Sequence, residues 1–280
     1  MYDSFSSDYD CFVDWEARLP AELPFIERQL QAVEASRVLD VACGTGMHTI
    51  ALAQKGYETA GADLSVGMIE RARANAAATG VDVRFEAAGF GGLARAFGMS
   101  RPEEPGLERL PSAASSSSAA SSGRRGVSLD ALLCLGNSLP HLLTPADLKA
   151  ALADFAACLR RGGLLLIQNR NFDAVMARGE RWMEPQARRE GAIEWLFLRF
   201  YDFQPDGTLT FNLATLRREE AGDWSQRVAS TQLRPLLQAE LVAALAEAGF
   251  AAAARYGDMS GAPFDPRVSP NLVITTRRHV

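Results

Sequence analysis

The 280-residue sequence is poor in the residues that build metal cages and disulfide frameworks, and it has no long apolar run. Its four cysteines lie far apart in the sequence and there are only three histidines, so neither kind of site is expected. No apolar run approaches the roughly 20 residues that a membrane helix needs. The first residues lack the cationic start and apolar segment of a signal peptide. We therefore expect no metal ion, no membrane and a reducing cytoplasm.

An excess of basic residues is also missing. The net charge is −5 and the pI is about 5.4, so no positive field favours nucleic acid or an anionic membrane. Hydrophobic residues make up 48% of the chain and charged residues 22%, as in globular proteins with a sizeable core. We expect a small-molecule partner. The sequence leaves the oligomeric state open, with a homo-oligomer as one alternative.

One stretch organises the chain, residues 38–46 (VLDVACGTG). An apolar run carries a single carboxylate, Asp40, and then breaks on Gly44 and Gly46 just before a segment typical of a helix. The pattern predicts a buried parallel strand, a tight turn and a helix N-terminus. The carboxyl end of such a strand is where open α/β sheets bind nucleotide-like ligands.

Strands and helices alternate after this stretch, which predicts a doubly wound, mostly parallel sheet of seven strands. Strands are expected at residues 38–43, 57–62, 81–87, 129–135, 163–167, 250–256 and 271–276, and helices at 47–54, 65–78, 145–159 and 235–248. At the N-terminus, aromatic residues at helical spacing (Tyr2, Phe5, Tyr9, Phe12 and Trp15) favour a helix that packs on the core, or alternatively a lid. Pro20 and Pro24 should break this pattern before an apolar helix at 25–33.

Two segments interrupt the alternation. Residues 99–126, rich in Ser and Ala, have little to bury and are expected to form a mobile surface insertion. Residues 192–233 predict a small antiparallel sheet, with strands at 193–203, 208–216 and 227–233. We therefore divide the chain into an N-terminal helical lid (1–36), a ligand-binding domain (37–170 and 234–280) and a cap over the substrate (171–233).

Asp63 strengthens the interpretation of the glycine turn. It lies 17 residues after Gly46, at the end of the second strand, where a carboxylate can accept hydrogen bonds from both hydroxyls of a ribose. A carboxylate at a strand end more often caps a helix, but its pairing with the glycine turn favours ribose recognition. A dinucleotide fingerprint would have a third glycine where Thr49 stands.

Residues 40–46 (DVACGTG), followed by 62–65 (ADLS) and Met68, resemble the class I S-adenosylmethionine-dependent methyltransferases. The resemblance implies a Rossmann-like methyltransferase fold whose seven-stranded sheet has a final antiparallel strand. It also implies S-adenosylmethionine as cofactor, with its methionine portion over the glycine turn and its ribose on the acid after strand two. The residues expected to bind it are Tyr9, Arg18, Asp40, Ala42, Gly44, Gly46, Asp63, Leu64, Met68, Ala88, Gly89, Phe90 and Leu135.

Residues 134–142 (CLGNSLPHL) and 167–173 (IQNRNFD) resemble glycine N-methyltransferases and glycine/sarcosine N-methyltransferases more narrowly. In that family the matching asparagine and arginine contact the amino-acid substrate, which assigns Asn137 and Arg170. An arginine suits a carboxylate because its planar guanidinium donates two parallel hydrogen bonds. By the same resemblance, Arg18 grips the cofactor's carboxylate. The chain departs from the family at Gly89-Phe90, where a polar contact to the adenine is usual; Phe90 can still stack, and main-chain groups of Ala88 and Gly89 would replace the polar contact.

The sequence thus predicts a methyltransferase that N-methylates a small amino acid such as glycine or sarcosine. Transfer from a sulfonium to a neutral amine is a direct displacement, so positioning by Asn137 and Arg170 suffices and no catalytic base is assigned. His141 is expected to be structural. The alternatives are an O- or N-methyltransferase for another small carboxylate-bearing metabolite and a non-catalytic S-adenosylmethionine-binding protein. A nicotinamide-dependent oxidoreductase is disfavoured by Thr49.

Overall fold

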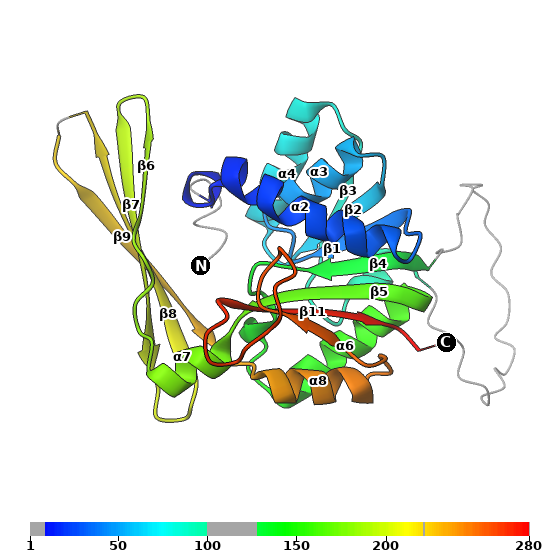
Figure 1. Cartoon of the computed structure of the whole chain (residues 1–280). Coiled ribbons are helices and arrows are strands. Elements are labelled where there is room, and N and C mark those ends of the chain that lie inside the picture. Colours follow the sequence, from blue (N-terminus) through cyan, green and yellow to red (C-terminus); the bar gives the residue numbers. More distant parts are fainter. Residues whose placement is uncertain (1–8, 100–127, 221, 280) are drawn as a thin grey trace, which may run out of the picture.

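The computed structural model describes residues 9–99, 128–220 and 222–279 (Figure 1). Tyr2, Phe5 and the predicted insertion at 99–126, apart from Met99, lie outside the described residues. The described elements form a seven-stranded sheet and a separate four-stranded sheet. In chain order they are α2 (Trp15–Gln31), β1 (Arg37–Val41), α3 (Met47–Gln54), β2 (Glu58–Asp63), α4 (Val66–Thr79), β3 (Arg84–Ala87), α5 (Leu93–Ala96), β4 (Leu129–Cys134), the 3₁₀ turn η1 (Leu139–His141), α6 (Pro145–Cys158), β5 (Leu159–Arg170), α7 (Phe172–Arg178), β6 (Gln186–Glu190), β7 (Ile193–Phe203), β8 (Leu209–Glu219), β9 (Ser225–Leu233), α8 (Gln238–Glu247), β10 (Ala254–Tyr256) and β11 (Asn271–Arg277).

The seven-stranded sheet confirms the predicted fold class. Its strand order is β10-β11-β5-β4-β1-β2-β3. The pairs from β5 to β3 are parallel, and β11 runs antiparallel to both β5 and β10. Several boundaries differ from the prediction. The strands expected at 81–87 and 250–256 are regular only over Arg84–Ala87 and Ala254–Tyr256, and the strand expected at 163–167 is longer, Leu159–Arg170. The carboxyl ends of β1, β2, β4 and β5 consequently meet along one edge of the sheet.

Helices cover both faces of this sheet, and each face has its own core cluster. On one face α2 buries Phe25, Ile26 and Leu30 against β1, β4 and β5. On the other face α6 and α8 pack against the same strands (Figure 1). Four of the five residues of β1 are buried, which is typical of a strand at the centre of a parallel sheet. The edge that carries the strand ends is therefore rigidly held from both sides.

The prediction that Pro20 and Pro24 break the N-terminal helix is wrong. Both residues lie inside the continuous helix α2. Proline removes an N–H donor and leaves a carbonyl four residues earlier without its helical partner. Here both prolines are on the exposed side of the helix, where those carbonyls can bond water instead. Burial of the opposite side of α2 in the core then outweighs the lost bonds.

The four-stranded antiparallel sheet, in the order β6-β7-β8-β9, stands beside the main body (Figure 1). Three of its strands were predicted, and β6 was not. The sequence of β6 (QARRE) is polar throughout and its residues are at least partly exposed, so it carries no alternating pattern. Charged residues on an edge strand are a common protection against pairing with other chains. Helix α7 attaches the sheet to β5, with Phe172 and Val175 packed on Tyr201.

Within the described ranges, no helix is both long and apolar enough to cross a membrane. The same residues contain no group of three or more His, Cys, Asp and Glu side chains that could hold a metal ion.

Candidate active site

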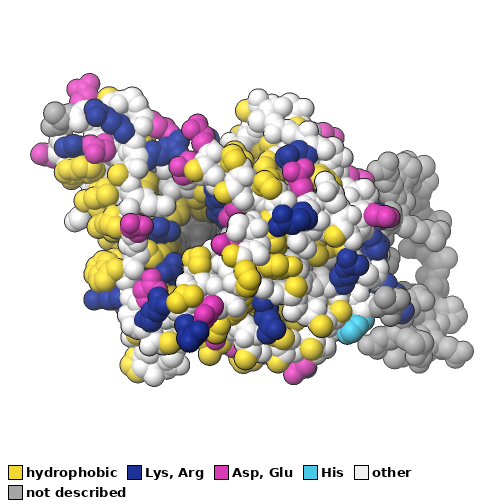
Figure 2. Space-filling view, in the orientation of Figure 1, with side chains coloured by type: hydrophobic (Ala, Val, Ile, Leu, Met, Phe, Trp, Pro, Cys, Tyr) yellow, Lys and Arg dark blue, Asp and Glu magenta, His cyan; other side chains and the backbone are white. Residues whose placement is uncertain are grey.

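A cavity of about 730 Å³ lies between the strand-end edge of the main sheet and one face of the antiparallel sheet. Figure 2 shows the molecule hollowed between these two parts. One wall is formed by the ends of β1 and β2 and the loops after them, and the opposite wall by β7, β8 and β9. The predicted glycine turn and the predicted acceptor residues therefore line one continuous space.

The turn after β1 is built on left-handed backbone conformations. Gly44 and Gly46 have φ of 56° and 78°, and Ala42, which is not a glycine, has φ of 54°. The ring of Tyr9 would lie 3.5 Å from a Cβ at Gly44, so a side chain there would meet the tyrosine. A Cβ at Gly46 would lie only 2.8 Å from the ring of Phe85. Gly46 thus allows the turn to approach Phe85 of β3 and Ala72 of α4 closely, whereas Gly44 faces the cavity.

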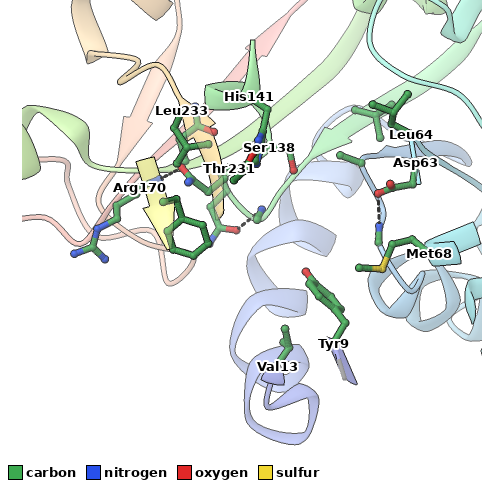
Figure 3. Close-up of a pocket in the computed structure, with 18 of the residues that line it drawn as sticks. Tyr9, Val13, Asp63, Leu64, Met68, Ser138, His141, Arg170, Thr231 and Leu233 are labelled. Atoms are coloured by element: carbon green, nitrogen blue, oxygen red, sulfur yellow. Dashed lines mark hydrogen bonds between the residues drawn. The ribbon is translucent and has the colours of Figure 1, made fainter. Parts of the chain in front are cut away.

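Asp63 is held at the cavity wall by the backbone of two loops. Its Oδ2 accepts a hydrogen bond from Gly44 N at 2.9 Å (Figure 3), and its Oδ1 accepts one from Ser65 N at 2.9 Å. Next to it, the side chain of Leu64 is 80% exposed although it lines the cavity. A large apolar side chain that is exposed inside a hollow offers a surface for a flat ligand ring. Phe90 lines the same region, with its ring 5.7 Å from that of Phe155.

A buried polar network connects helices α2 and α3 with the end of β5 beside the cavity. Glu22 of α2 accepts a bond from Arg18 Nε at 3.0 Å and lies 2.7 Å from His48 Nε2, while its other oxygen accepts from Gln168 Nε2. Burial disfavours the charged carboxylate, but the bonds from His48 and Arg18 outweigh burial and lower the pKa of Glu22 to about 2. The network fixes the guanidinium of Arg18 at the cavity, also bonded to Gln168 Oε1.

Residues 9–13 cover the cavity between the two walls (Figure 3). Asp10 fastens this segment, because its carboxylate accepts bonds from Thr45 Oγ1 at 2.6 Å, Trp15 Nε1, Arg71 Nε and Asn75 Nδ2. Phe12 packs on the antiparallel sheet with its ring 5.3 Å from that of Phe197. The segment is thereby tied both to the glycine turn and to the opposite wall.

Asn137 and Arg170 come together at the ends of β4 and β5, as the sequence predicted. Asn137 has a left-handed backbone (φ of 68°), and its Oδ1 accepts a bond from Arg170 N at 3.0 Å. The side-chain carbonyl of Asn137 is thus used within the protein, and a ligand contact would come from its NH₂ group. The Arg170 guanidinium pairs with Glu180 at 2.8 Å. Figure 3 shows Arg170 on the side of the cavity opposite Asp63.

The structure places most of the predicted cofactor residues on the cavity surface. Asp40, Gly46 and Leu135 do not line it. Asp40 is buried behind the turn, where it accepts a bond from Thr49 Oγ1 at 2.9 Å, and burial raises its pKa to about 6. The predicted residues that do line the cavity are Tyr9, Arg18, Ala42, Gly44, Asp63, Leu64, Met68, Ala88, Gly89, Phe90, Asn137 and Arg170.

Sequence analysis missed several polar residues of the cavity. Gln168 and Asn169 directly precede Arg170, so the shared strand end could have revealed them. Arg199 and Tyr201 alternate with outward residues on β7, and this period of two was the available signal. His141, expected to be structural, also lines the cavity; burial lowers its pKa to about 4, so its imidazole is neutral at pH 7.

Comparison with known sequences agrees with the fold. Residues 38–97 match a family model described as a methyltransferase domain. The glycine/sarcosine N-methyltransferase of Parasynechococcus marenigrum is 32% identical over 177 residues, which are 63% of this chain and 53% of that protein. The chain therefore spans about half the length of this relative.

Solved structures match nearly the whole chain, among them the following two. A methyltransferase of Clostridium acetobutylicum that depends on S-adenosylmethionine superposes with a TM-score of 0.71 at 15% identity, covering 100% of this chain and 99% of the other. A sugar N-methyltransferase of a Streptoalloteichus species gives a TM-score of 0.67 at 20% identity, covering 97% and 93%. At these identities the likeness establishes the fold alone.

Proposed function

We propose that the chain, in which residues 38–97 match a methyltransferase domain, uses S-adenosylmethionine to methylate the nitrogen of a small amino acid such as glycine or sarcosine. The observation that carries this proposal is the continuity of the cavity. The glycine turn and Asp63 lie at one side, and Arg170 lies at the other side of the same space. A methyl donor and an amino-acid acceptor could therefore meet in it.

The residues of the first wall fit the cofactor. Asp63 would accept hydrogen bonds from the ribose hydroxyls, and the exposed Leu64 would cover one face of the adenine opposite Phe90. Arg18, fixed by Glu22 and Gln168, would bind the carboxylate of the methionine portion. Exposing the apolar side chain of Leu64 to water costs free energy, and a ligand ring that covers it removes that cost.

The opposite wall supports a small acceptor that carries a carboxylate. Arg170 would donate to that carboxylate, with the NH₂ group of Asn137 beside it. Residues 171–233 would act as the cap over the acceptor and residues 9–13 as the lid, while α2 belongs to the core of the main domain. Apolar side chains of β8 and β9, among them Phe211 and Leu233, would exclude water from the acceptor nitrogen.

Bound S-adenosylmethionine would supply a methyl group on a sulfonium. The lone pair of an amine would attack this methyl carbon, and the sulfur would leave as the thioether of S-adenosylhomocysteine. The protein's contribution would be to align the nitrogen with that methyl group and to keep water out. A new N–C bond forms as the S–C bond breaks, and the amine afterwards loses its extra proton to solvent. His141 is neutral at pH 7 and adds no positive charge that would repel the sulfonium.

The test is an incubation with methyl-labelled S-adenosylmethionine and a panel of amines that includes glycine, sarcosine, other small amino acids and amino sugars. We expect label in N-methylated glycine or sarcosine and formation of S-adenosylhomocysteine. Label only in another carboxylate-bearing metabolite would keep the methyltransferase and change its acceptor. Tight binding of S-adenosylhomocysteine without transfer to any amine would favour a non-catalytic binding protein.

We also propose a reducing, cytoplasmic location. Cys43, Cys134 and Cys158 are buried as free thiols, and burial raises the pKa of Cys158 to about 12, which keeps it unreactive. Fractionation of the native cells would test the location directly.

A further inference from the structure

One charged residue stands on the cavity face of β7. Side chains alternate between the two faces of a strand, and the inward positions here are Trp195, Phe197, Arg199 and Tyr201. Trp195, Phe197 and Tyr201 are buried, and Leu213, the cross-strand neighbour of Arg199, is also buried. Arg199 thus brings a guanidinium into a wall of the cavity that is otherwise uncharged and mostly apolar. A charge in such surroundings is costly unless something compensates it.

Among the described residues Arg199 is poorly compensated. The one hydrogen bond that its guanidinium makes there is from Nη2 to the carbonyl oxygen of Glu184, at 3.5 Å, and the guanidinium lies over the ring of Phe12, 5.4 Å from the centroid. Its Nε is buried and has no hydrogen-bond partner among the described residues. No carboxylate of the described chain lies within ion-pair distance of it. Burial, and then the nearby Arg170, lower the pKa of Arg199.

Arg170, unlike Arg199, has a partner for its charge among the described residues. It is paired with Glu180, so its positive charge is already balanced, although its Nε is also buried without a partner in the described part of the chain. The group of Arg170, Glu180 and Arg199 therefore carries one net positive charge. A single carboxylate would neutralise it and supply acceptors for both unpartnered Nε–H groups.

We propose that Arg199 binds the methyl acceptor, whose carboxylate would lie between Arg199 and Arg170. This inference rests on the proposed function and deepens it: the charge on the cap selects an anionic amine over an uncharged one of similar size. An amino sugar without an acidic group would leave Arg199 uncompensated in this mostly apolar wall. The cap thereby sets the chemical class of the acceptor.

The experiment compares Arg199→Gln with the wild type and with Arg189→Gln, which removes the same charge from the outward face of β6. Steady-state rates are measured with glycine and with glycinamide, which lacks the carboxylate charge, and calorimetry measures sarcosine binding to protein saturated with S-adenosylhomocysteine. In Arg199→Gln we expect the KM of glycine and the Kd of sarcosine to rise about 10-fold or more, while the KM of S-adenosylmethionine stays within about 2-fold. The preference for glycine over glycinamide should shrink by a similar factor, and Arg199→Lys should restore part of it.

Equal losses with glycine and glycinamide would show that Arg199 merely supports the sheet, and they would overturn the inference. If the wild type methylates amino acids and Arg199→Gln does so with the same KM for glycine, the inference is overturned and the proposed function stands. A wild type that neither binds sarcosine nor methylates an amino acid would overturn both. Arg189→Gln should behave as the wild type throughout, because its side chain faces away from the cavity.

Discussion

The two walls of the cavity hold their polar groups in different ways. On the wall of β1 and β2, Asp63 accepts bonds from the backbone of two loops and Arg18 is fixed by Glu22 and Gln168. The second wall consists of β7, β8 and β9 together with the end of β5. Here, within the described residues, Arg170 and Arg199 each have a buried Nε without a partner, and both amide atoms of Asn169 are likewise unpartnered.

This difference separates a prearranged binding surface from one that a ligand must complete. Polar groups already held by the protein lose little freedom when a ligand arrives. Buried groups without partners cost free energy until a ligand satisfies them, and a ligand that cannot do so is rejected strongly. The first wall is thus suited to a common ligand, and the second to discrimination among acceptors. The first three of the following variants should affect one wall and spare the other, and the fourth should spare both.

The largest effect is expected from Asp63→Ala. The substitution removes the proposed ribose acceptor and also the hydrogen bonds that Asp63 accepts from Gly44 N and Ser65 N. We expect the affinity for S-adenosylhomocysteine to fall about 100-fold or more, since bonds to charged groups contribute about 1.5–3 kcal/mol each. Isothermal calorimetry measures this affinity. An unchanged affinity would contradict the ribose assignment, and Asp63→Asn, which keeps one acceptor oxygen, should lie in between.

Arg170→Lys should act on the second wall. Lysine keeps the charge, but it lacks the planar fork that donates two parallel bonds to a carboxylate. We expect the acceptor's KM to rise about 10- to 50-fold with little change in the KM of S-adenosylmethionine. Initial-rate kinetics with each substrate varied in turn give both constants. If the two constants rise together, the carboxylate assignment of Arg170 is wrong.

Glu22→Gln should weaken the first wall more modestly. The variant removes the charge that binds Arg18 and His48, so Arg18 would lose its fixed orientation. We expect cofactor affinity to fall about 10-fold and the free energy of unfolding to fall by about 2–3 kcal/mol at pH 7. Calorimetry and urea denaturation measure the two quantities. Because the pKa of Glu22 is lowered to about 2, the stability difference should be full above pH 4.5 and fade as the pH falls toward 2.

The smallest effect is expected from Asp40→Asn, which lies behind the first wall and should change stability rather than binding. Burial raises the pKa of Asp40 from 3.8 to about 6. The wild type is therefore most stable, as far as this group is concerned, below pH 3.8 and loses that contribution as the pH rises through 6. As the pH rises from 5 to 8, the free energy of unfolding of the variant should increase by about 1–2 kcal/mol relative to that of the wild type. Denaturation curves at both pH values measure this gain, and a gain that does not grow with pH would contradict the buried, charged state.

The first wall was largely predictable from the sequence. On the second wall Asn137 and Arg170 were also predicted, from the motifs at their strand ends, but Arg199 was not. Gly44 and Asp63 belong to local strand–turn–helix patterns, whose spacing fixes where the residues lie. The helix expected from residue 65 is capped there, since Ser65 Oγ accepts a hydrogen bond from Met68 N. Arg199 reaches the cavity only because the antiparallel sheet folds back over the strand ends. The period of two along residues 193–203 groups Arg199 with Tyr201 on one face of the strand, but it does not say which part of the molecule that face meets.

Other differences follow from the same limit. The prolines of α2 were judged on helix propensity alone, yet which side of a helix is exposed depends on the core it packs against. Strand β6 was missed because an exposed edge strand needs no apolar alternation. Local pattern thus predicts backbone geometry well where the neighbours are close in sequence, and poorly where packing decides.

Trp15 gives the molecule an optical reporter. Its indole N–H bonds Asp10, which fastens the segment that covers the cavity, and its ring lies 5.4 Å from that of His48 and 5.3 Å from the guanidinium of Arg18. The other three tryptophans, Trp182, Trp195 and Trp224, belong to the antiparallel sheet and the segments beside it. Events near the glycine turn should therefore alter emission from Trp15, and events at the antiparallel sheet should alter emission from the other three. We expect ligand binding to change the intrinsic fluorescence of the unmodified protein.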